Sequence, residues 1–454
     1  MSNLAVSSSM NQIFPLPEVK FRVEEHNDIF HTQKNLAEQN LLKNKIARLA
    51  WNIFSIIFIP LGIARLCLFM IKPLLSSCIL PAGVEFNLAK KENALKNAVN
   101  SNAARLEIQI ESLKNLHKAR ESFLGDPENH ARQVTIETAD QVKLDTIVIE
   151  HSSQQSRAAT EQKWIVIMPG NLMCYEQFLN LAKKFSDKIQ VNVLFGNYRG
   201  VMRSEGAATS LHDLVLDGEA MIQYLLQQKV PQENILIHAV SLGGGVGAEV
   251  ASYHQNEHDG MHLYSDRSFS TLASAIKSVV PLAITLMPQM NLVGRVSARL
   301  MSWIGPRLLG NMGAMAASLG GWKLDSLANF QKVKGKKFII YSHGDGIIRY
   351  HASLYKALKE MQMTPLDRKL KAERIEAKAQ GTTSPLKDYE QNYKPKSIRV
   401  EVSLTAEKLA ARANITIEQA REQLGCHSHC LPILDMGSAG PQYIKNVKDA
   451  LRII

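Results

Sequence analysis

Short, continuously apolar runs alternate with longer amphipathic stretches through the middle of the chain. Such runs are typical of strands buried on both faces, whereas apolar residues three or four positions apart indicate helices. Their alternation predicts a mostly parallel sheet with helices on both faces, an α/β fold that binds ligands at the carboxyl ends of its strands. The predicted buried strands are 164–168, 191–195, 235–238, 261–264 and 337–341.

A pair of half-buried strands opens this region. Residues 133–137 and 142–150 alternate apolar and polar positions around a polar turn, as the two strands of a hairpin do. We therefore expect the α/β domain to span 133–454. Two longer intervals within it do not fit the alternation, and we expect them to form a lid at about 270–325 and a helical insertion at about 363–425.

The chain before this domain divides into three segments. Residues 1–48 are mixed and polar and lack a secretory signal, so no Sec export is expected. Residues 49–82 are the longest apolar stretch, but the run 49–64 would cover only about 24 Å of a hydrocarbon core roughly 30 Å thick. We expect a bent, membrane-associated hairpin, and the alternative is a helical hairpin buried against the domain. Residues 85–124 predict one long amphipathic helix, packed on the domain or on a partner.

The residues around Ser241 read as a strand, a sharp turn and a glycine-rich helix start. A catalytic serine must project from a tight turn, meet a base and leave a backbone N–H for the developing oxyanion, because its hydroxyl is a poor nucleophile. Small residues two positions before and after the serine give the turn room, and here they are Ala239 and Gly243. The motif predicts a nucleophile, with alanine where the GxSxG pattern has its first glycine. A plain glycine-rich turn is the alternative.

Three segments at the ends of predicted strands resemble loops of the α/β-hydrolase superfamily. They are 168–171, where that superfamily has its oxyanion loop, 197–206, which resembles its Tyr-Arg-Gly loop, and 239–243 at its nucleophile elbow. The resemblance covers about 133–362 and 427–454 and implies an α/β-hydrolase fold with a Ser-His-Asp triad. It also implies that the backbone N–H groups of Leu242 and Asn171 are the oxyanion donors, with Leu172 as the alternate to Asn171.

The same resemblance implies the acid and the base. The segment 342–350 resembles the superfamily's acid loop and places the carboxylate at Asp345, while Asp266, after the preceding strand, is the alternate. In this superfamily the catalytic histidine follows the acid along the chain. His429 is preferred, because a short run follows it before the last predicted helix, and His427 is the alternate.

Composition and charge bear on partners rather than on the fold. Five cysteines, unevenly spaced, argue against a disulfide scaffold, and one short Cys/His cluster has no second ligand group at metal-binding spacing. We expect no metal and no other cofactor.

The net charge is +11, and residues 267–324 carry six basic side chains and no acidic one. Because no nucleic-acid-binding motif accompanies this charge, we expect an anionic membrane surface as partner and no nucleic acid.

A second resemblance joins the apolar segment, the long helix and the hydrolase-like core. Together they resemble the SidB-like, or chlamydial CHLPS, group of hydrolase-like proteins of intracellular pathogens, some of which are type IV secreted effectors. Two hypotheses follow. The first is a serine hydrolase, similar to an esterase, lipase or thioesterase, acting on an ester or thioester of a lipid or acylated substrate. The second is an inert hydrolase-like scaffold that binds a membrane or a host protein, which the replaced motif glycine and the missing oxyanion-loop histidine motivate.

Overall fold

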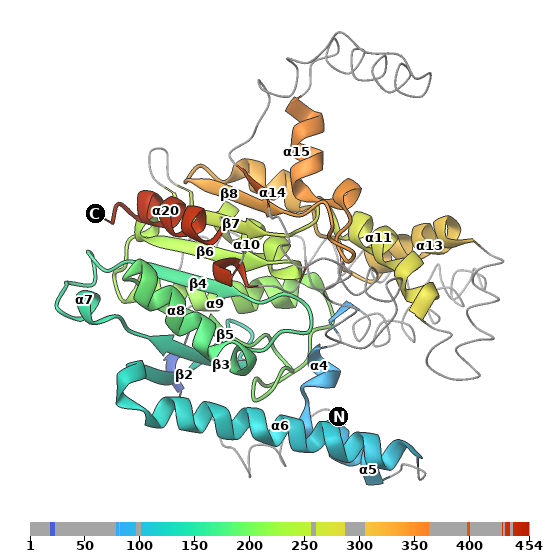
Figure 1. Cartoon of the computed structure of the whole chain (residues 1–454), viewed down its shortest axis with the longest axis horizontal. Coiled ribbons are helices and arrows are strands. Elements are labelled where there is room, and N and C mark those ends of the chain that lie inside the picture. Colours follow the sequence, from blue (N-terminus) through green and yellow to red (C-terminus); the bar gives the residue numbers. More distant parts are fainter. Residues whose placement is uncertain are drawn as a thin grey trace, which may run out of the picture.

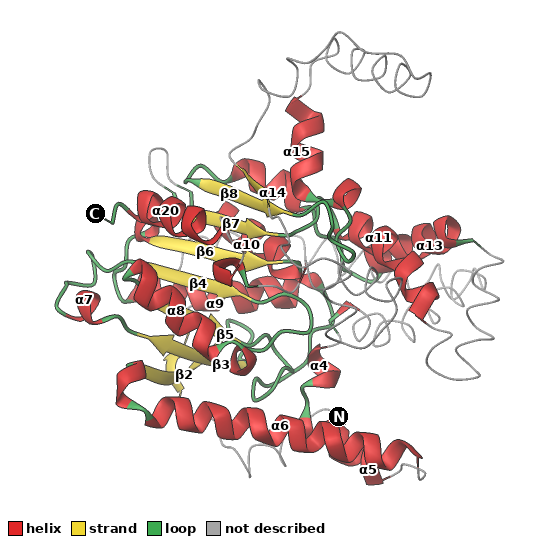
Figure 2. Ribbon diagram, in the orientation of Figure 1, coloured by secondary structure: helices red, strands yellow, loops and turns green. Residues whose placement is uncertain are grey.

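The predicted apolar runs lie side by side at the centre of one mixed sheet (Figures 1 and 2). The computed structural model describes residues 19–22, 79–80, 82–96, 101–255, 260–286, 305–362, 397–399, 429, 432–435 and 439–453. Within these ranges nine strands pair in the order β1 (Val19–Arg22), β2 (Ala131–Glu137), β3 (Lys143–Ile149), β5 (Asn192–Gly196), β4 (Trp164–Met168), β6 (Ile235–Val240), β7 (His262–Asp266), β8 (Lys337–Tyr341) and β9 (Ser397–Arg399). β3 is antiparallel to β2 and to β5, and every other neighbouring pair is parallel.

Helices cover both faces of this sheet. α8 (Leu179–Ile189) and α20 (Ala439–Leu451) pack together on one face, and α9 (Leu211–Gln227) and α10 (Leu242–Tyr253) pack together on the other (Figure 1). The α/β fold predicted from the sequence is therefore confirmed. Among the described residues, the other helices of four or more residues are α4 (Ala82–Glu85), α5 (Leu88–Lys96), α6 (Ser101–Gly125), α7 (Ser152–Gln155), α11 (Leu272–Leu286), α13 (Pro306–Leu319), α14 (Ser326–Lys332) and α15 (Leu354–Gln362).

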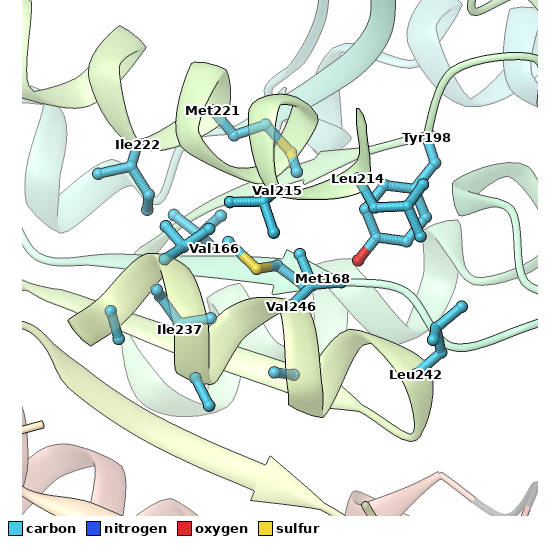
Figure 3. Packing of buried hydrophobic residues seen from close by; sticks show 14 of the residues in the cluster. Val166, Met168, Tyr198, Leu214, Val215, Met221, Ile222, Ile237, Leu242 and Val246 are labelled. Atoms are coloured by element: carbon cyan, nitrogen blue, oxygen red, sulfur yellow. The ribbon is translucent and has the colours of Figure 1, made fainter. Parts of the chain in front are cut away.

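The side chains of the central strands are part of two hydrophobic cores, one on each face of the sheet. Successive side chains of a strand point to opposite faces, so an uninterrupted apolar run supplies both sides of the sheet. In β4, Trp164, Val166 and Met168 belong to the core under α9 and α10, and Ile165 and Ile167 belong to the core under α8 and α20. Figure 3 shows the first core, where side chains of β4 and β6 meet those of α9 and α10.

The predicted long helix over 85–124 is wrong in one respect, because the structure divides it into α5 and α6. Lys91 Nζ donates to Gln109 Oε1 at 3.0 Å. In one continuous helix these residues would be about 27 Å apart along the axis. α6 runs beside the edge of the sheet (Figure 1) and contacts β2, and its Ile110 and Leu113 are buried in the first core. Of the two packing modes expected for this region, α6 packs on the domain.

The predicted membrane-associated hairpin, 49–82, lies almost wholly outside the described residues. Its described end, at Ile79, Leu80 and Ala82, reaches the domain, and Leu80 and Ala82 are buried in the first core. Among the helices of the described ranges, none combines the length and apolarity needed to cross a bilayer.

Both predicted insertions are described in part. In the lid, α11 and α13 pack against each other, and 287–304 lies outside the described residues. Of the predicted helical insertion at 363–425, the structure describes only β9, a three-residue strand that pairs with β8 at the sheet edge. β1, in the polar segment 1–48, extends the opposite edge. The predicted start of the domain at 133 falls inside β2.

Candidate active site

Ser241 occupies the sharp turn between β6 and α10. Its backbone has φ 51° and ψ −112°, a conformation that non-glycine residues rarely adopt and that is kept only where the surroundings enforce it. Two hydrogen bonds hold it there, since the Ser241 N–H donates to the carbonyl oxygen of Asp266 at 2.8 Å and the Ser268 hydroxyl donates to the Ser241 carbonyl at 2.8 Å. The turn therefore presents the Ser241 side chain at the carboxyl end of the sheet.

Small residues let α10 approach the ends of β4 and β6. A Cβ on Gly243 would lie 2.3 Å from the Met168 carbonyl oxygen, so any side chain there would collide with backbone. A Cβ on Gly247 would lie 2.7 Å from the Cβ of Ala239. The alanine that replaces the first motif glycine is thus accommodated because Gly247, opposite it on α10, has no side chain.

Three side chains from distant parts of the chain form a hydrogen-bonded row. His429 Nε2 lies 2.9 Å from Ser241 Oγ, and His429 Nδ1 lies 2.7 Å from Asp345 Oδ2. All three residues are buried. The other carboxylate oxygen, Asp345 Oδ1, accepts the backbone N–H groups of Ile347 at 2.9 Å and Ile348 at 2.8 Å. The loop after β8 therefore orients the carboxylate and leaves one oxygen for the histidine.

The two alternates for acid and base are placed differently. Asp266 forms a two-point ion pair with the neighbouring Arg267, from Nε to Oδ1 at 2.6 Å and from the terminal nitrogen to Oδ2 at 2.9 Å. Its backbone carbonyl accepts the Ser241 N–H. His427 lies outside the described residues.

The loop after β4 lies directly against the serine. A Cβ on Gly170 would be 3.2 Å from Ser241 Cβ, so the backbone passes within contact of the nucleophile candidate. The Leu172 N–H already donates to Asn171 Oδ1 at 2.9 Å. The Leu242 N–H is in the first turn of α10, where a helix leaves its N–H groups without partners inside the helix. The Leu172 N–H is therefore already bound within the loop, and Leu242 and Asn171 stay the expected oxyanion donors.

The Asn171 side chain connects this loop to the N-terminal region. Its Nδ2 donates to the carbonyl oxygen of Ile79 at 2.9 Å. Nearby, the N–H of Met202, in the Tyr-Arg-Gly loop, donates to the Phe86 carbonyl at 3.1 Å. Both loops at the carboxyl edge of the sheet are therefore hydrogen-bonded to residues 79–86, at the end of the apolar stretch and just after it.

Arg199 of the Tyr-Arg-Gly loop has a structural role. Its guanidinium is bound by Asp217 of α9, with Nε to Oδ1 at 2.8 Å, and by Asp140 in the β2–β3 turn at 2.7 Å. These two carboxylates raise the pKa of Arg199 against the opposing effect of burial. Asp217 also accepts the Arg199 backbone N–H at 2.8 Å. The loop is thus held to two elements, and its arginine is not available to a substrate.

A neutral aromatic layer lies beneath the site on the other side of β6. His238 contacts the rings of Phe185 and Tyr443, and its Nδ1 lies 3.1 Å from the Tyr443 hydroxyl. Burial lowers the pKa of His238 to about 4, with Arg267 acting in the same direction and Asp266 opposing it. His238 is therefore uncharged at neutral pH and packs as part of the core.

Two residues that hold the site were not anticipated from the sequence, Ser268 and Ile79. The Ser268 hydroxyl donates to a backbone carbonyl, and Ile79 accepts through its own backbone carbonyl. The residue types at these positions therefore do not predict either hydrogen bond. In the part of the chain that the structure describes, no group of three or more His, Cys, Asp or Glu side chains could hold a metal ion.

Comparison with known proteins gives one match over most of the chain and several distant ones. The family described as Chlamydia CHLPS protein (DUF818) matches residues 10–291. The multifunctional-autoprocessing repeats-in-toxin of Vibrio vulnificus is 29% identical over 127 residues, which are 28% of this chain and 2% of the toxin. The chain thus spans a very small part of that curated relative.

Similar solved structures include two hydrolases. The Pyrococcus furiosus esterase Pf2001 is 15% identical, with 66% of this chain and 90% of that chain covered and a TM-score of 0.37. An alpha-beta hydrolase from Vibrio vulnificus is 17% identical, with 72% of this chain and 85% of that chain covered and a TM-score of 0.39. At such TM-scores these likenesses say nothing about the activity of this chain.

Proposed function

This chain belongs to the Chlamydia CHLPS protein family, and from that premise we propose that it is a serine hydrolase of the α/β-hydrolase superfamily. The observation that carries the proposal is the hydrogen-bonded row Ser241, His429 and Asp345, with 2.9 Å and 2.7 Å between the interacting atoms. These distances are those required for a nucleophile, its general base and the acid that orients the base.

In the proposed reaction Ser241 Oγ attacks the carbonyl carbon of an ester or thioester. His429 Nε2 takes the hydroxyl proton as the new C–O bond forms, and the carbonyl electron pair moves onto oxygen. Asp345 Oδ2 accepts a hydrogen bond from the Nδ1–H group, which fixes the tautomer that leaves Nε2 basic and stabilises the imidazolium; the proton stays on Nδ1. When the intermediate collapses, Nε2 gives its proton to the departing alcohol or thiol, and an acyl-serine remains.

The second half of the reaction repeats these steps with water. His429 Nε2 deprotonates a water molecule that attacks the acyl-serine, and then returns the proton to Ser241. In both halves the backbone N–H groups of Leu242 and Asn171 stabilise the oxyanion. Each such donor contributes about 3 kcal/mol to lowering the barrier.

We infer an acylated or lipid substrate and a membrane surface as the place of reaction. The inference is supported by the apolar stretch at 49–82 and by the basic charge of the lid, which suit an acyl chain below anionic headgroups. Secretion into a host cell stays a prediction from the resemblance to effector proteins.

The deciding experiment is covalent labelling by a fluorophosphonate probe, which reacts with activated serines. Wild type should be labelled, Ser241→Ala should not be, and Ser156→Ala, which removes an exposed hydroxyl far along the chain from the site, should be labelled like wild type. Circular dichroism should show that all three are folded. An unlabelled, folded wild type would favour the inert scaffold instead.

A further inference from the structure

Helix α13 of the lid packs through its small residues. The face turned toward α11 carries Gly310, Gly313, Ala314 and Ala317, and the two alanines are buried. A Cβ on Gly310 would lie 3.3 Å from the Cα of Lys277 in α11, so the two helix backbones approach closely. This close approach explains why the inward face has no large side chain.

The opposite face of α13 carries the large apolar side chains. Leu308, Met312, Met315 and Leu319 are spaced four, three and four residues apart, which places them in one row along the helix. Their exposed fractions are 53%, 52%, 62% and 62%. We call this row the outer stripe. A helix at a protein surface normally turns its large apolar side chains toward the core and its polar side chains toward water. A contiguous exposed apolar row instead marks a surface that binds a partner or a membrane.

The charge around the outer stripe selects between those two occupants. Helices α11 and α13 contain no acidic residue, and their basic residues are Lys277 and Arg307. An exposed lysine, Lys323, follows α13, whereas Arg267 is buried in its ion pair with Asp266. An apolar row on a pair of helices that carry positive but no negative side chains complements anionic headgroups above acyl chains, which is how interfacial helices bind. Methionine adds a flexible apolar side chain suited to an irregular surface.

We propose that the outer stripe of α13 is the surface through which this protein docks on an anionic lipid membrane. This rests on the membrane association proposed above and locates it on the lid. Ser278 of α11 accepts the Arg349 N–H at 3.1 Å and donates to the Ile347 carbonyl at 3.3 Å. Those residues follow Asp345, so the docked helix pair is joined to the loop that holds the acid and sets the site near the lipid surface.

The first measurement is partition of the full-length protein onto vesicles of phosphatidylcholine with phosphatidylserine. Met312→Gln/Met315→Gln keeps length and helix propensity but removes apolar surface. Partition of this variant should fall about tenfold, because membrane affinity scales with the apolar area buried. Ile108→Gln, which alters a 71% exposed residue on α6, is the matched control and should bind like wild type. Ser241→Ala should bind normally even if the hydrolase proposal fails.

The second measurement locates the contact independently of other lipid-binding segments. Met315→Trp and Ile108→Trp are mixed with vesicles that contain brominated phosphatidylcholine, which quenches indole fluorescence. Quenching beyond that of wild type should occur for M315W and not for I108W, and it supports the proposal whether or not other segments dominate the affinity. Absence of extra quenching for M315W overturns it, even if partition of the glutamine variant falls. A wild-type dimer that M312Q/M315Q splits, without M315W quenching, would make the stripe a protein interface.

Discussion

At the scale of single residues, hydrogen bonds distinguish the predicted acid, Asp345, from its alternate, Asp266. Asp345 and Asp266 both follow a predicted strand. One oxygen of Asp345 is occupied by two backbone N–H groups, so the other faces His429, whereas both oxygens of Asp266 are bound by Arg267. The position of each carboxylate is set by the shape of its loop, which residue type alone does not reveal.

Replacing Asp345 by asparagine should lower kcat with an ester such as p-nitrophenyl butyrate by about 10³- to 10⁴-fold while KM changes little. The amide can donate to Nδ1 and thereby favours the tautomer whose Nε2 carries the proton and cannot act as a base. Steady-state kinetics of Asp345→Asn beside Asp187→Asn, a change at the surface of α8, test this. Retention of more than a tenth of wild-type kcat would contradict the assignment of the acid.

At the scale of elements, the sequence predicts the central buried strands well and the elements at the sheet edges and near the N-terminus poorly. β8 has the bounds that its apolar run predicts, and β4 does too, because a continuous apolar run bounded by turn-forming residues fits a strand buried on both faces. β1 and β9, of four and three residues, are too short to show a period of two. α5 ends at Lys96 and α6 begins at Ser101, and the sequence between them has neither proline nor glycine, the residues that would predict an interruption.

In the candidate site, too, the residues marked by a local sequence pattern could be predicted and those placed by long-range contacts could not. The turn at Ser241 has a local glycine pattern, and the loop of Asp345 has a local resemblance, so both could be proposed from short segments. The choice between His427 and His429 depends on contacts with residues that are more than 80 positions away in the sequence, which no local pattern records. The hydrogen bond from Ser268 to the backbone of Ser241 could not be predicted for a different reason, because it depends on the geometry of the two loops rather than on residue type.

The packing of β6 against α10 supports a prediction at this scale. Gly247→Ala should lower the free energy of unfolding by about 1 to 3 kcal/mol, because the new methyl overlaps that of Ala239. Ala239→Gly removes the overlapping group, so the double variant should regain at least about 1 kcal/mol. Urea unfolding of the two single variants and the double variant measures the coupling. Strictly additive losses would mean that these two methyl positions do not interact.

At the scale of the whole molecule, the free energy of unfolding depends on pH through histidines, such as His238, that are buried in the uncharged form. His238 has its pKa lowered to about 4 by burial, and an unfolded histidine titrates near 6.5. Between these values the unfolded chain binds more protons than the folded one. The contribution of His238 is therefore fully present above pH 6.5 and is lost as the pH falls toward 4.

His238→Asn should reduce the acid sensitivity of the fold. Asparagine can still face the Tyr443 hydroxyl but does not titrate, so between pH 7 and pH 5 it should lose about 2 kcal/mol less of its free energy of unfolding than wild type loses. Urea unfolding at the two pH values measures this difference. His212→Asn, at an exposed position on α9, is the control and should show the wild-type dependence. Equal losses for H238N and wild type would show that His238 is not the responsible group.

The hydrogen bond between Asn171 and Ile79 limits how far the gene can be shortened. A coding sequence cut at the predicted domain boundary of 133 would omit part of β2, the partner of the oxyanion-loop side chain, and the buried side chains of Leu80 and Leu88. A shortened product of this kind should expose apolar core, aggregate on expression and lose the support of the loop beside Ser241. A coding sequence for the α/β domain therefore needs to begin upstream of Ile79.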